Sequence, residues 1–336
     1  MMQVSAGLFF SQAADQMFIP HPTRSPVGNA GYQRVFKPGK LTLGMFFPIE
    51  AFDGDMPTMQ NQVALAQHAE RARFASLAFR DVPLRDPHFG DSGQVFDVWP
   101  YLGYIAGQTQ EIALLTAAVV LPLRHPIHIA KAAASVDQLS NGRLLLGVAS
   151  GDRPVEFPAF DVDFDTRGAA FREEMELLKI YWGEYFPRVD SRFGHLAGAD
   201  VIPKPVASHI PLLVTGHSQQ DLAWIAEHAD GWMTYPRSIA AQEQVIKRWR
   251  DTVTAVLPGQ YKPLVQSYFI DLTDDPHASP TPIHLGHRLG RNALLVHLRV
   301  SRSIGVDHLI FNLKYGKRPA AEVLQELGEF VVPEFA

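Results

Sequence analysis

Short apolar runs alternate with longer segments of helical periodicity along most of the chain. A run rich in Val, Ile and Leu predicts a strand that is covered on both faces, as in a parallel sheet. Eight such runs follow residue 40. The predicted strands are 41–47, 76–79, 112–121, 143–149, 212–215, 231–235, 264–272 and 308–313.

Between these strands, apolar positions recur every three or four residues, which predicts amphipathic helices. The predicted helices are 61–74, 96–108, 129–139, 168–182, 219–229, 242–256, 283–304 and 319–331. The strands begin roughly 30–40 residues apart, about the length of one strand–helix unit. Eight such units predict an α/β fold, a closed (β/α)8 TIM barrel. A doubly wound sheet is the alternative, but it usually carries a G-x-G-x-x-G loop after the first strand, and this chain has none there.

Two segments fall outside this alternation. Residues 1–39 are rich in Pro and Gly and predict an irregular N-terminal extension, which leaves 40–336 for the barrel domain. Three apolar residues of the extension, Tyr32, Val35 and Phe36, are candidates for attaching it to the barrel. Residues 183–209 show no clear period and predict an insertion before the fifth strand.

Composition narrows the classes of function. The chain has 336 residues, a formal charge of −5 and no cysteine. A slightly acidic chain without a basic block argues against a nucleic-acid partner, and no apolar run reaches the roughly 18–20 residues of a membrane helix. Disulfides and thiolate metal sites are excluded, and His125 and His128 have no third ligand placed by the sequence, so we expect no metal. A cytoplasmic location is the default expectation.

Candidate chemistry is expected at the carboxyl ends of the strands, because a barrel builds its site there. Small, hydroxyl and basic side chains dominate these positions, which suits a flat anionic cofactor better than a metal. The candidates include Phe46, Arg80, Asp81, Thr116, Ala117, Ala118, Ser150, Gly151, Thr215, Gly216, His217 and Ser218.

The sharpest local signal is the run Thr-Gly-His-Ser-Gln at 215–219, where a strand turns into a predicted helix. The N–H groups of a helix N-terminus, together with the hydroxyl of Ser218, would form a phosphate site. Ser218 could equally serve only as the helix cap. Arg167 could add a bidentate phosphate contact, or pair with a carboxylate on the surface.

Two small residues, Ala117 and Ala118, lie in the third predicted strand. Their size leaves room for a flat molecule against the backbone, although a core strand without a ligand explains them as well. After the fourth strand, Ser150 and Gly151 would let the backbone approach a ligand closely, or Gly151 serves only the turn.

These segments, in their order and spacing, resemble the bacterial luciferase-like flavin monooxygenases over about residues 41–313. The matching pieces are 41–48, 69–74, 116–122 with His125 and Pro126, 137–143 with Gly147, Gly216 with Ser218, and 229–232. The resemblance implies a barrel that binds reduced FMN, or a deazaflavin in a sister branch. It also implies a homodimer, a separate reductase that supplies the reduced flavin, and a small organic substrate oxidised with O2.

The resemblance also assigns residues. It implies a cis peptide between Ala117 and Ala118 beneath the flavin ring, and a phosphate site at Ser218 with Arg167. Luciferase has a catalytic histidine just after the second strand, where this chain has Val82, so a different substrate class is expected. Our catalytic candidates are Arg80, Asp81 and His217. Our cofactor-binding candidates are Phe46, Thr116, Ala117, Ala118, Ser150, Gly151, Arg167, Thr215, Gly216, Ser218 and Gln219.

Three alternatives to an FMN-dependent monooxygenase stay open. A deazaflavin-dependent oxidoreductase needs basic residues near the phosphate candidate for an acidic tail, and our only downstream candidates for that role are Arg237 and Lys247. A flavin-binding protein without turnover is allowed by the missing histidine. A metal-dependent barrel hydrolase is disfavoured because no ligand spacing supports it.

Overall fold

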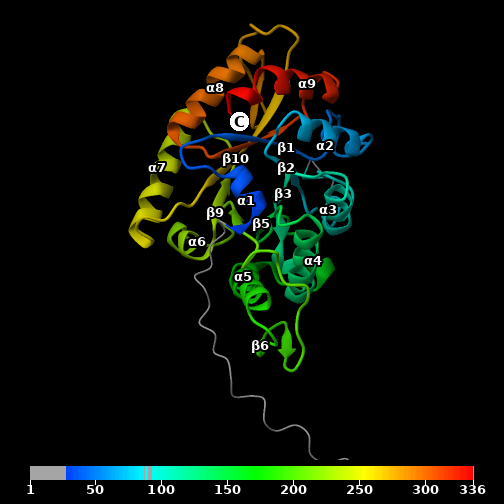
Figure 1. Ribbon diagram of the computed structural model, residues 1–336, viewed down its shortest axis with the longest axis vertical. Helices are drawn as coiled ribbons and strands as arrows, with labels where there is room; N and C mark the ends of the chain where they lie inside the picture. Colours follow the sequence, from blue (N-terminus) through cyan, green and yellow to red (C-terminus); the bar gives the residue numbers. More distant parts are fainter. Residues whose placement is uncertain (1–27, 87, 90–92, 336) are drawn as a thin grey trace, which may run out of the picture.

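The computed structural model describes residues 28–86, 88–89 and 93–335, so the first part of the expected extension, 1–27, lies outside the described residues. Eight parallel strand positions close into a barrel, which confirms the predicted fold (Figure 1). Closure comes from pairing of β13 with β1 and of β10 with both β9 and β13. The barrel strands are β1 (Thr42–Phe46), β2 (Ser76–Phe79), β3 (Ala113–Thr116) continued by β4 (Val119–Val120), β5 (Leu144–Ala149), β8 (Leu212–Thr215), β9 (Gly231–Thr234), β10 (Leu264–Leu272) and β13 (His308–Asn312).

Helices surround the strands and bury one apolar stripe each. In the last of them, for example, Val323, Leu324 and Leu327 face the barrel. These helices are α2 (Gln62–Arg71), α3 (Val98–Ala106), α4 (Pro126–Leu139), α5 (Arg167–Gly183), α6 (Leu222–His228), α7 (Ile239–Val256), α8 (Arg291–Ile304) and α9 (Ala320–Phe330). Short 3-10 turns lie at η2 (Leu121–Leu123), η3 (Phe157–Phe160), η4 (Phe164–Thr166) and η5 (Val332–Glu334). Within the part of the chain that the structure describes, no helix has the length and apolar character needed to cross a membrane.

A small helix, α1 (Ala30–Val35), closes the amino-terminal end of the barrel. Its Tyr32 and Val35, with Phe36, pack into one cluster with side chains from inside the barrel such as Leu145 and Ile310. The later part of the expected extension is therefore ordered as a plug. Its three apolar residues that the sequence indicated as attachment points hold it to the barrel.

Two loops carry hairpins of their own. The expected insertion before the fifth barrel strand contains the antiparallel pair β6 (Val189–Ser191) and β7 (Gly194–Leu196). The helix predicted at 283–304 begins only at Arg291, and before it lie β11 (Thr281–Ile283) and β12 (Gly286–Leu289). This part of the helix prediction is wrong because β12 pairs with β10 instead. Gly286 permits that pairing, since a Cβ there would lie 1.8 Å from the carbonyl oxygen of Phe269.

Candidate active site

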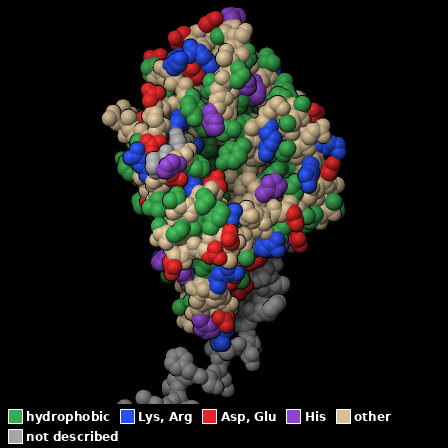
Figure 2. All heavy atoms as spheres, turned by 180° about the vertical axis from the view of Figure 1, so that it is seen from behind, with side chains coloured by type: hydrophobic (Ala, Val, Ile, Leu, Met, Phe, Trp, Pro, Cys, Tyr) green, Lys and Arg blue, Asp and Glu red, His purple; other side chains and the backbone are tan. Residues whose placement is uncertain are grey.

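A cavity of about 1160 Å³ opens at the carboxyl ends of the barrel strands. Figure 2 shows the face opposite that of Figure 1, with a hollow bordered by hydrophobic side chains. All but one of the predicted site residues line the cavity: Phe46, Arg80, Asp81, Ala117, Ala118, Ser150, Gly151, Arg167, Thr215, Gly216, His217, Ser218 and Gln219. The exception is Thr116, which is fully buried and donates its hydroxyl to the carbonyl of Gly147 at 2.7 Å.

The third strand is interrupted where it passes the cavity. β3 pairs with β5 up to Leu115, and pairing resumes at Val119 in β4. Between them, the peptide bond joining Ala117 and Ala118 is cis, as the family resemblance implied. The two methyl groups lie half-buried on the cavity wall, so this wall offers a flat surface with small side chains.

The loop after β8 has an unusual backbone. Gly216, Ser218 and Gln219 have φ angles of 60°, 46° and 61°. The predicted helix start at 219 is therefore wrong, because α6 begins at Leu222 and is capped by the carboxylate of Asp221. Ser218 thus caps no helix. Its hydroxyl instead donates to the carbonyl of Thr215 at 2.9 Å and accepts the N–H of Ser150 at 3.2 Å, which ties the loops after β8 and β5 together.

Arg167 is the first residue of α5 and lies beside this loop. A Cβ on the next residue, Gly168, would lie 2.7 Å from the Cβ of Gln219, so α5 starts directly against the loop. The guanidinium of Arg167 donates to the carbonyls of Phe164 (2.7 Å) and Gly151 (3.3 Å) and stacks 3.5 Å from the Phe164 ring centre. A fixed cation and the N-terminus of a long helix both favour an anion here. We name Arg167, the first turn of α5 and residues 216–219 the anion corner.

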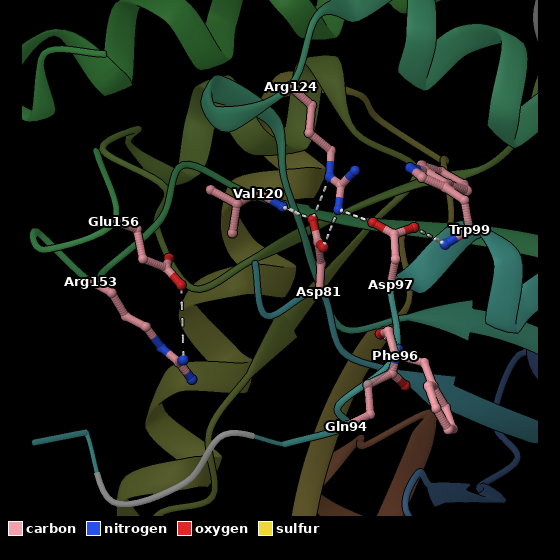
Figure 3. A network of polar contacts seen from close by, with 9 residues as sticks. All are labelled: Asp81, Gln94, Phe96, Asp97, Trp99, Val120, Arg124, Arg153 and Glu156. Atoms are coloured by element: carbon pink, nitrogen blue, oxygen red, sulfur yellow. Dashed lines mark hydrogen bonds and ion pairs between the residues drawn. The ribbon is translucent and has the colours of Figure 1, made fainter. Parts of the chain in front are cut away.

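Asp81 lines the cavity, but its carboxylate is held by an arginine outside it (Figure 3). Arg124 donates to both carboxylate oxygens, at 2.9 and 2.7 Å, and also reaches Asp97 at 2.9 Å. Burial raises the pKa of Asp81, and the Arg124 guanidinium opposes that rise. A proton transfer to Asp81 would therefore have to break its ion pair with Arg124. We interpret Asp81 as a residue that supports the loop after β2. Arg80, beside it, stacks 5.6 Å from the ring centre of Phe46.

His217 is exposed within the same cavity. Its Nδ1 lies 3.3 Å from the carbonyl oxygen of Gln220, which can only accept, so this nitrogen carries the proton. In a neutral imidazole with this tautomer, the other ring nitrogen, Nε2, is an acceptor. The ring contacts the indole of Trp232 edge-on at 5.8 Å, and that indole in turn donates to the carbonyl of Gly216.

The sequence profile of the luciferase-like monooxygenase family matches residues 41–269, more than half of the chain. The chain belongs to this family. An uncharacterized protein of Mycobacterium tuberculosis is 36% identical to it over 154 residues, which are 45% of this chain and 54% of that protein. The chain thus spans about half the length of this curated relative.

Solved structures share the fold of this luciferase-like chain. A monooxygenase from Streptomyces bottropensis superposes with a TM-score of 0.72 at 18% identity, over 88% of this chain and 100% of that one. An F420-dependent tetrahydromethanopterin reductase from Methanopyrus kandleri gives a TM-score of 0.70 at 15% identity, over 88% and 100% of the two chains. At such identities the likeness supports the barrel and leaves cofactor and substrate open.

Several cavity residues of this family member were missed from the sequence. Glu156, after β5, has a side chain only 2% exposed, and its Oε1 lies 4.0 Å from Arg153 Nη1 (Figure 3). Burial raises the pKa of Glu156. The charged residues that directly follow β5 in the sequence could have indicated the pair of Arg153 and Glu156. No such signal existed for His284 and Leu285, because their hairpin was predicted as helix.

Proposed function

We propose that this luciferase-like chain is an FMN-dependent monooxygenase that uses reduced flavin and O2 on a small organic substrate. The observation that carries the proposal is one cavity that combines the anion corner with the flat surface at Ala117 and Ala118. Family membership supports an oxidoreductase in general. The finer statement rests on how well these residues suit a flat ring joined to a phosphate.

The side chains and backbone that border the cavity fit a flat ring joined to a phosphate. Arg167 supplies a fixed positive charge, and a charge-assisted contact of this kind contributes about 1.5–3 kcal/mol. Gly216 lines the cavity, and a Cβ there would meet no atom within 4 Å, so its backbone borders open space. The cavity of about 1160 Å³ exceeds the range of roughly 300–1,000 Å³ typical of ligand pockets, which leaves room for a substrate beside a cofactor.

Reduced FMN, when bound, supplies the electrons with which O2 is activated and one oxygen atom is transferred to the substrate. The chain's own residues bind, orient and hold protons. The anion corner holds the phosphate, Ser218 fixes the corner by joining two loops, and the two alanines support the ring. The Nε2 of His217 is the acceptor that we propose to hold a proton next to the reacting groups.

Absorption spectroscopy tests the proposal. We expect the purified protein to bind added FMN, with a shifted flavin spectrum and quenched fluorescence, and to bind reduced FMN more tightly than oxidised FMN. Oxygen uptake after mixing with chemically reduced FMN would then report turnover. Binding of F420 in preference to FMN would contradict the proposal.

A deazaflavin-dependent oxidoreductase is the second candidate, because F420-dependent enzymes share the fold. The two basic residues that we expected to bind an acidic tail argue against this candidate, because both already have partners. Arg237 donates to the hydroxyl of Thr234 and to the carbonyl of Tyr235, and Lys247 is paired with Asp251. A flavin-binding protein without turnover is the third candidate, and it predicts tight FMN binding without substrate-dependent oxygen uptake.

The partners and the location belong to the same proposal. We propose a homodimer in the cytoplasm that receives reduced flavin from a separate reductase. A groove of about 770 Å³ between α2 and α3, rimmed by the exposed rings of Phe96 and Tyr104, is the face that we expect the second copy to cover. Light scattering of the purified chain gives the oligomeric state directly, and a monomer at micromolar concentration would contradict the dimer.

A further inference from the structure

One buried amide joins the two elements that meet at the anion corner. Gln220 follows directly after the loop 216–219 and is only 6% exposed. Its Nε2 donates to the carbonyl of Gly168, in the first turn of α5, at 2.9 Å and to the carbonyl of Ser218, in the loop, at 3.0 Å. The side chain of Gln220 therefore bridges α5 and the loop after β8.

An arginine of α5 fixes the direction in which this amide points. Nε of Arg172 donates to Oε1 of Gln220 at 2.6 Å. A guanidinium can only donate and a backbone carbonyl can only accept, so the amide oxygen must face Arg172 and the amide nitrogen must face the two carbonyls. Arg172 is exposed, and its guanidinium carbon lies 5.3 Å from the ring centre of Trp224 on α6. A surface side chain thus sets the orientation of a buried amide.

The loop needs such support because its backbone is strained. Ser218 and Gln219 have φ angles of 46° and 61°, in the left-handed region that residues other than glycine rarely adopt. Such conformations persist where surrounding contacts impose them, and they are concentrated at ligand sites. The hydrogen bond from the Gln220 amide ends on the carbonyl of Ser218, one of the two strained residues. The bridge therefore stabilises the loop in this conformation against α5.

The backbone of Gln220 also holds His217. Its N–H donates to the carbonyl of His217 at 2.8 Å, and its carbonyl accepts the N–H of His217 Nδ1 at 3.3 Å. These two bonds close residues 217–220 into a compact turn. The same residue therefore joins the loop to α5 and orients the imidazole at the cavity.

We propose that Gln220 is the positioning residue of the anion corner and that Arg172 orients its amide, so that the loop after β8 and the first turn of α5 together fit a phosphate monoester. This inference rests on the proposed function for the flavin and adds the residues that set the geometry of its phosphate site. Neither side chain has to touch the phosphate, because a bridge of this kind acts by fixing the groups that do.

The test is fluorescence titration with FMN and, separately, with riboflavin, which lacks the phosphate. Gln220→Ala removes the bridge without a change of charge, and we expect FMN to bind about tenfold more weakly, as for the loss of two hydrogen bonds, with riboflavin affinity unchanged. Gln220→Glu keeps the shape but cannot donate to the two carbonyls and adds a negative charge, so its loss for FMN should be larger. The matched control is Gln325→Ala, at an exposed position of α9 where the amide bonds to Glu329, and it should change neither affinity.

A double-mutant cycle tests whether Arg172 acts through Gln220. Arg172→Ala should weaken FMN binding about threefold, and Arg172→Lys, which keeps a donor, should restore most of the affinity. The same Arg172→Ala change made in the Gln220→Ala protein should add no further loss, whereas additive losses would show that Arg172 acts on the phosphate by its charge alone and would overturn its orienting role. Arg192→Ala, whose arginine pairs with Glu173 on α5, controls for a general loss of positive charge and should leave FMN affinity unchanged.

Two results would overturn the role of Gln220. One is unchanged FMN affinity in both Gln220 variants, with circular dichroism showing intact folds. The other is an equal loss for FMN and riboflavin, which would indicate a general loosening of the cavity. If the Gln220 variants do not fold, the exposed position of Arg172 decides: wild-type FMN affinity in Arg172→Ala would contradict the bridge, and a loss that Arg172→Lys restores would support it.

A wild-type protein that binds no FMN would refute the proposed function instead. Inorganic phosphate then serves as the probe, and its effect on the thermal unfolding of the protein is measured. Stabilisation by phosphate in the wild type that is lost in Gln220→Ala would support the bridge without any flavin. Absence of stabilisation in the wild type, or equal stabilisation in both proteins, would overturn it.

Discussion

The two ends of the barrel differ in how completely their central polar groups are hydrogen-bonded. At the amino-terminal end, Arg143 is 5% exposed and His308 fully buried, and each is surrounded by hydrogen-bond partners. At the carboxyl end, Glu156 keeps a buried carboxylate oxygen without a hydrogen bond. Buried polar groups are normally satisfied, so groups left available point to a ligand. The closed end stabilises the barrel, and the open end carries the candidate site.

The largest effect is expected at the closed end. Arg143 donates to the carbonyls of Ala106, Thr109, Ile112 and Ser140 and to the Thr109 hydroxyl. Arg143→Ala would leave several buried carbonyls unpaired and should cost about 3–5 kcal/mol in the free energy of unfolding. Urea denaturation measures it. The matched control is Arg299→Ala, whose arginine forms an exposed pair with Glu334, and a similar loss in both variants would contradict the comparison.

The next effect is expected at the open end and concerns binding. Ala118→Leu adds three carbons on the cavity wall where the flavin ring is proposed to lie, so FMN binding should weaken by about 100-fold or more while the fold is kept. Flavin fluorescence titration and thermal unfolding measure the two quantities. Ala255→Leu, at an exposed position near the end of α7, provides the control with the same change of size. Normal FMN affinity in Ala118→Leu would place the flavin elsewhere.

A smaller loss is expected from the anion corner. Arg167→Ala combined with Ser218→Ala removes the fixed cation and the hydroxyl that joins the β5 and β8 loops. FMN should bind at least about tenfold more weakly, since a charge-assisted contact contributes about 1.5–3 kcal/mol. Riboflavin, which lacks the phosphate, sharpens the test, because its affinity should change little in the same variant. Equal losses for both flavins would contradict a phosphate role.

The same contrast explains which features were visible in the sequence. The barrel was predictable because a strand buried on both faces needs a continuous apolar run. Most residues predicted for the site line the cavity because the carboxyl ends of the barrel strands follow those runs. The start of α6 and the hairpin with His284 were not predictable. They depend on backbone geometry at Ser218 and on the contact of Gly286 with β10, which involve partners distant in sequence. The network of Arg143 was hidden for the same reason, since its acceptors are backbone carbonyls.

The smallest expected effect is a pH dependence of the free energy of unfolding, and it arises at the closed end. Asp137 is fully buried and accepts hydrogen bonds from the N–H of Val206 at 2.8 Å and from the amide of Asn29 at 3.3 Å. Burial raises the pKa of Asp137 to about 6, despite these bonds. An unfolded aspartate titrates near pKa ~3.9, so the folded protein holds this proton more tightly than the unfolded chain. The stabilising contribution is complete below about pH 4 and is lost as the pH rises through 6.

Asp137→Asn should remove this dependence, because an amide can still accept from Val206 but does not titrate. We expect the free energy of unfolding of the wild type to fall relative to the variant by about 1–2 kcal/mol between pH 4 and pH 6.5. Taking the difference between the two proteins cancels the other titrating groups, including His308, whose pKa burial lowers to about 3. FMN affinity, measured at both pH values, should be the same for both proteins. Parallel stability curves would mean that Asp137 titrates normally, and that this end of the barrel is less tightly closed to water than its hydrogen bonds indicate.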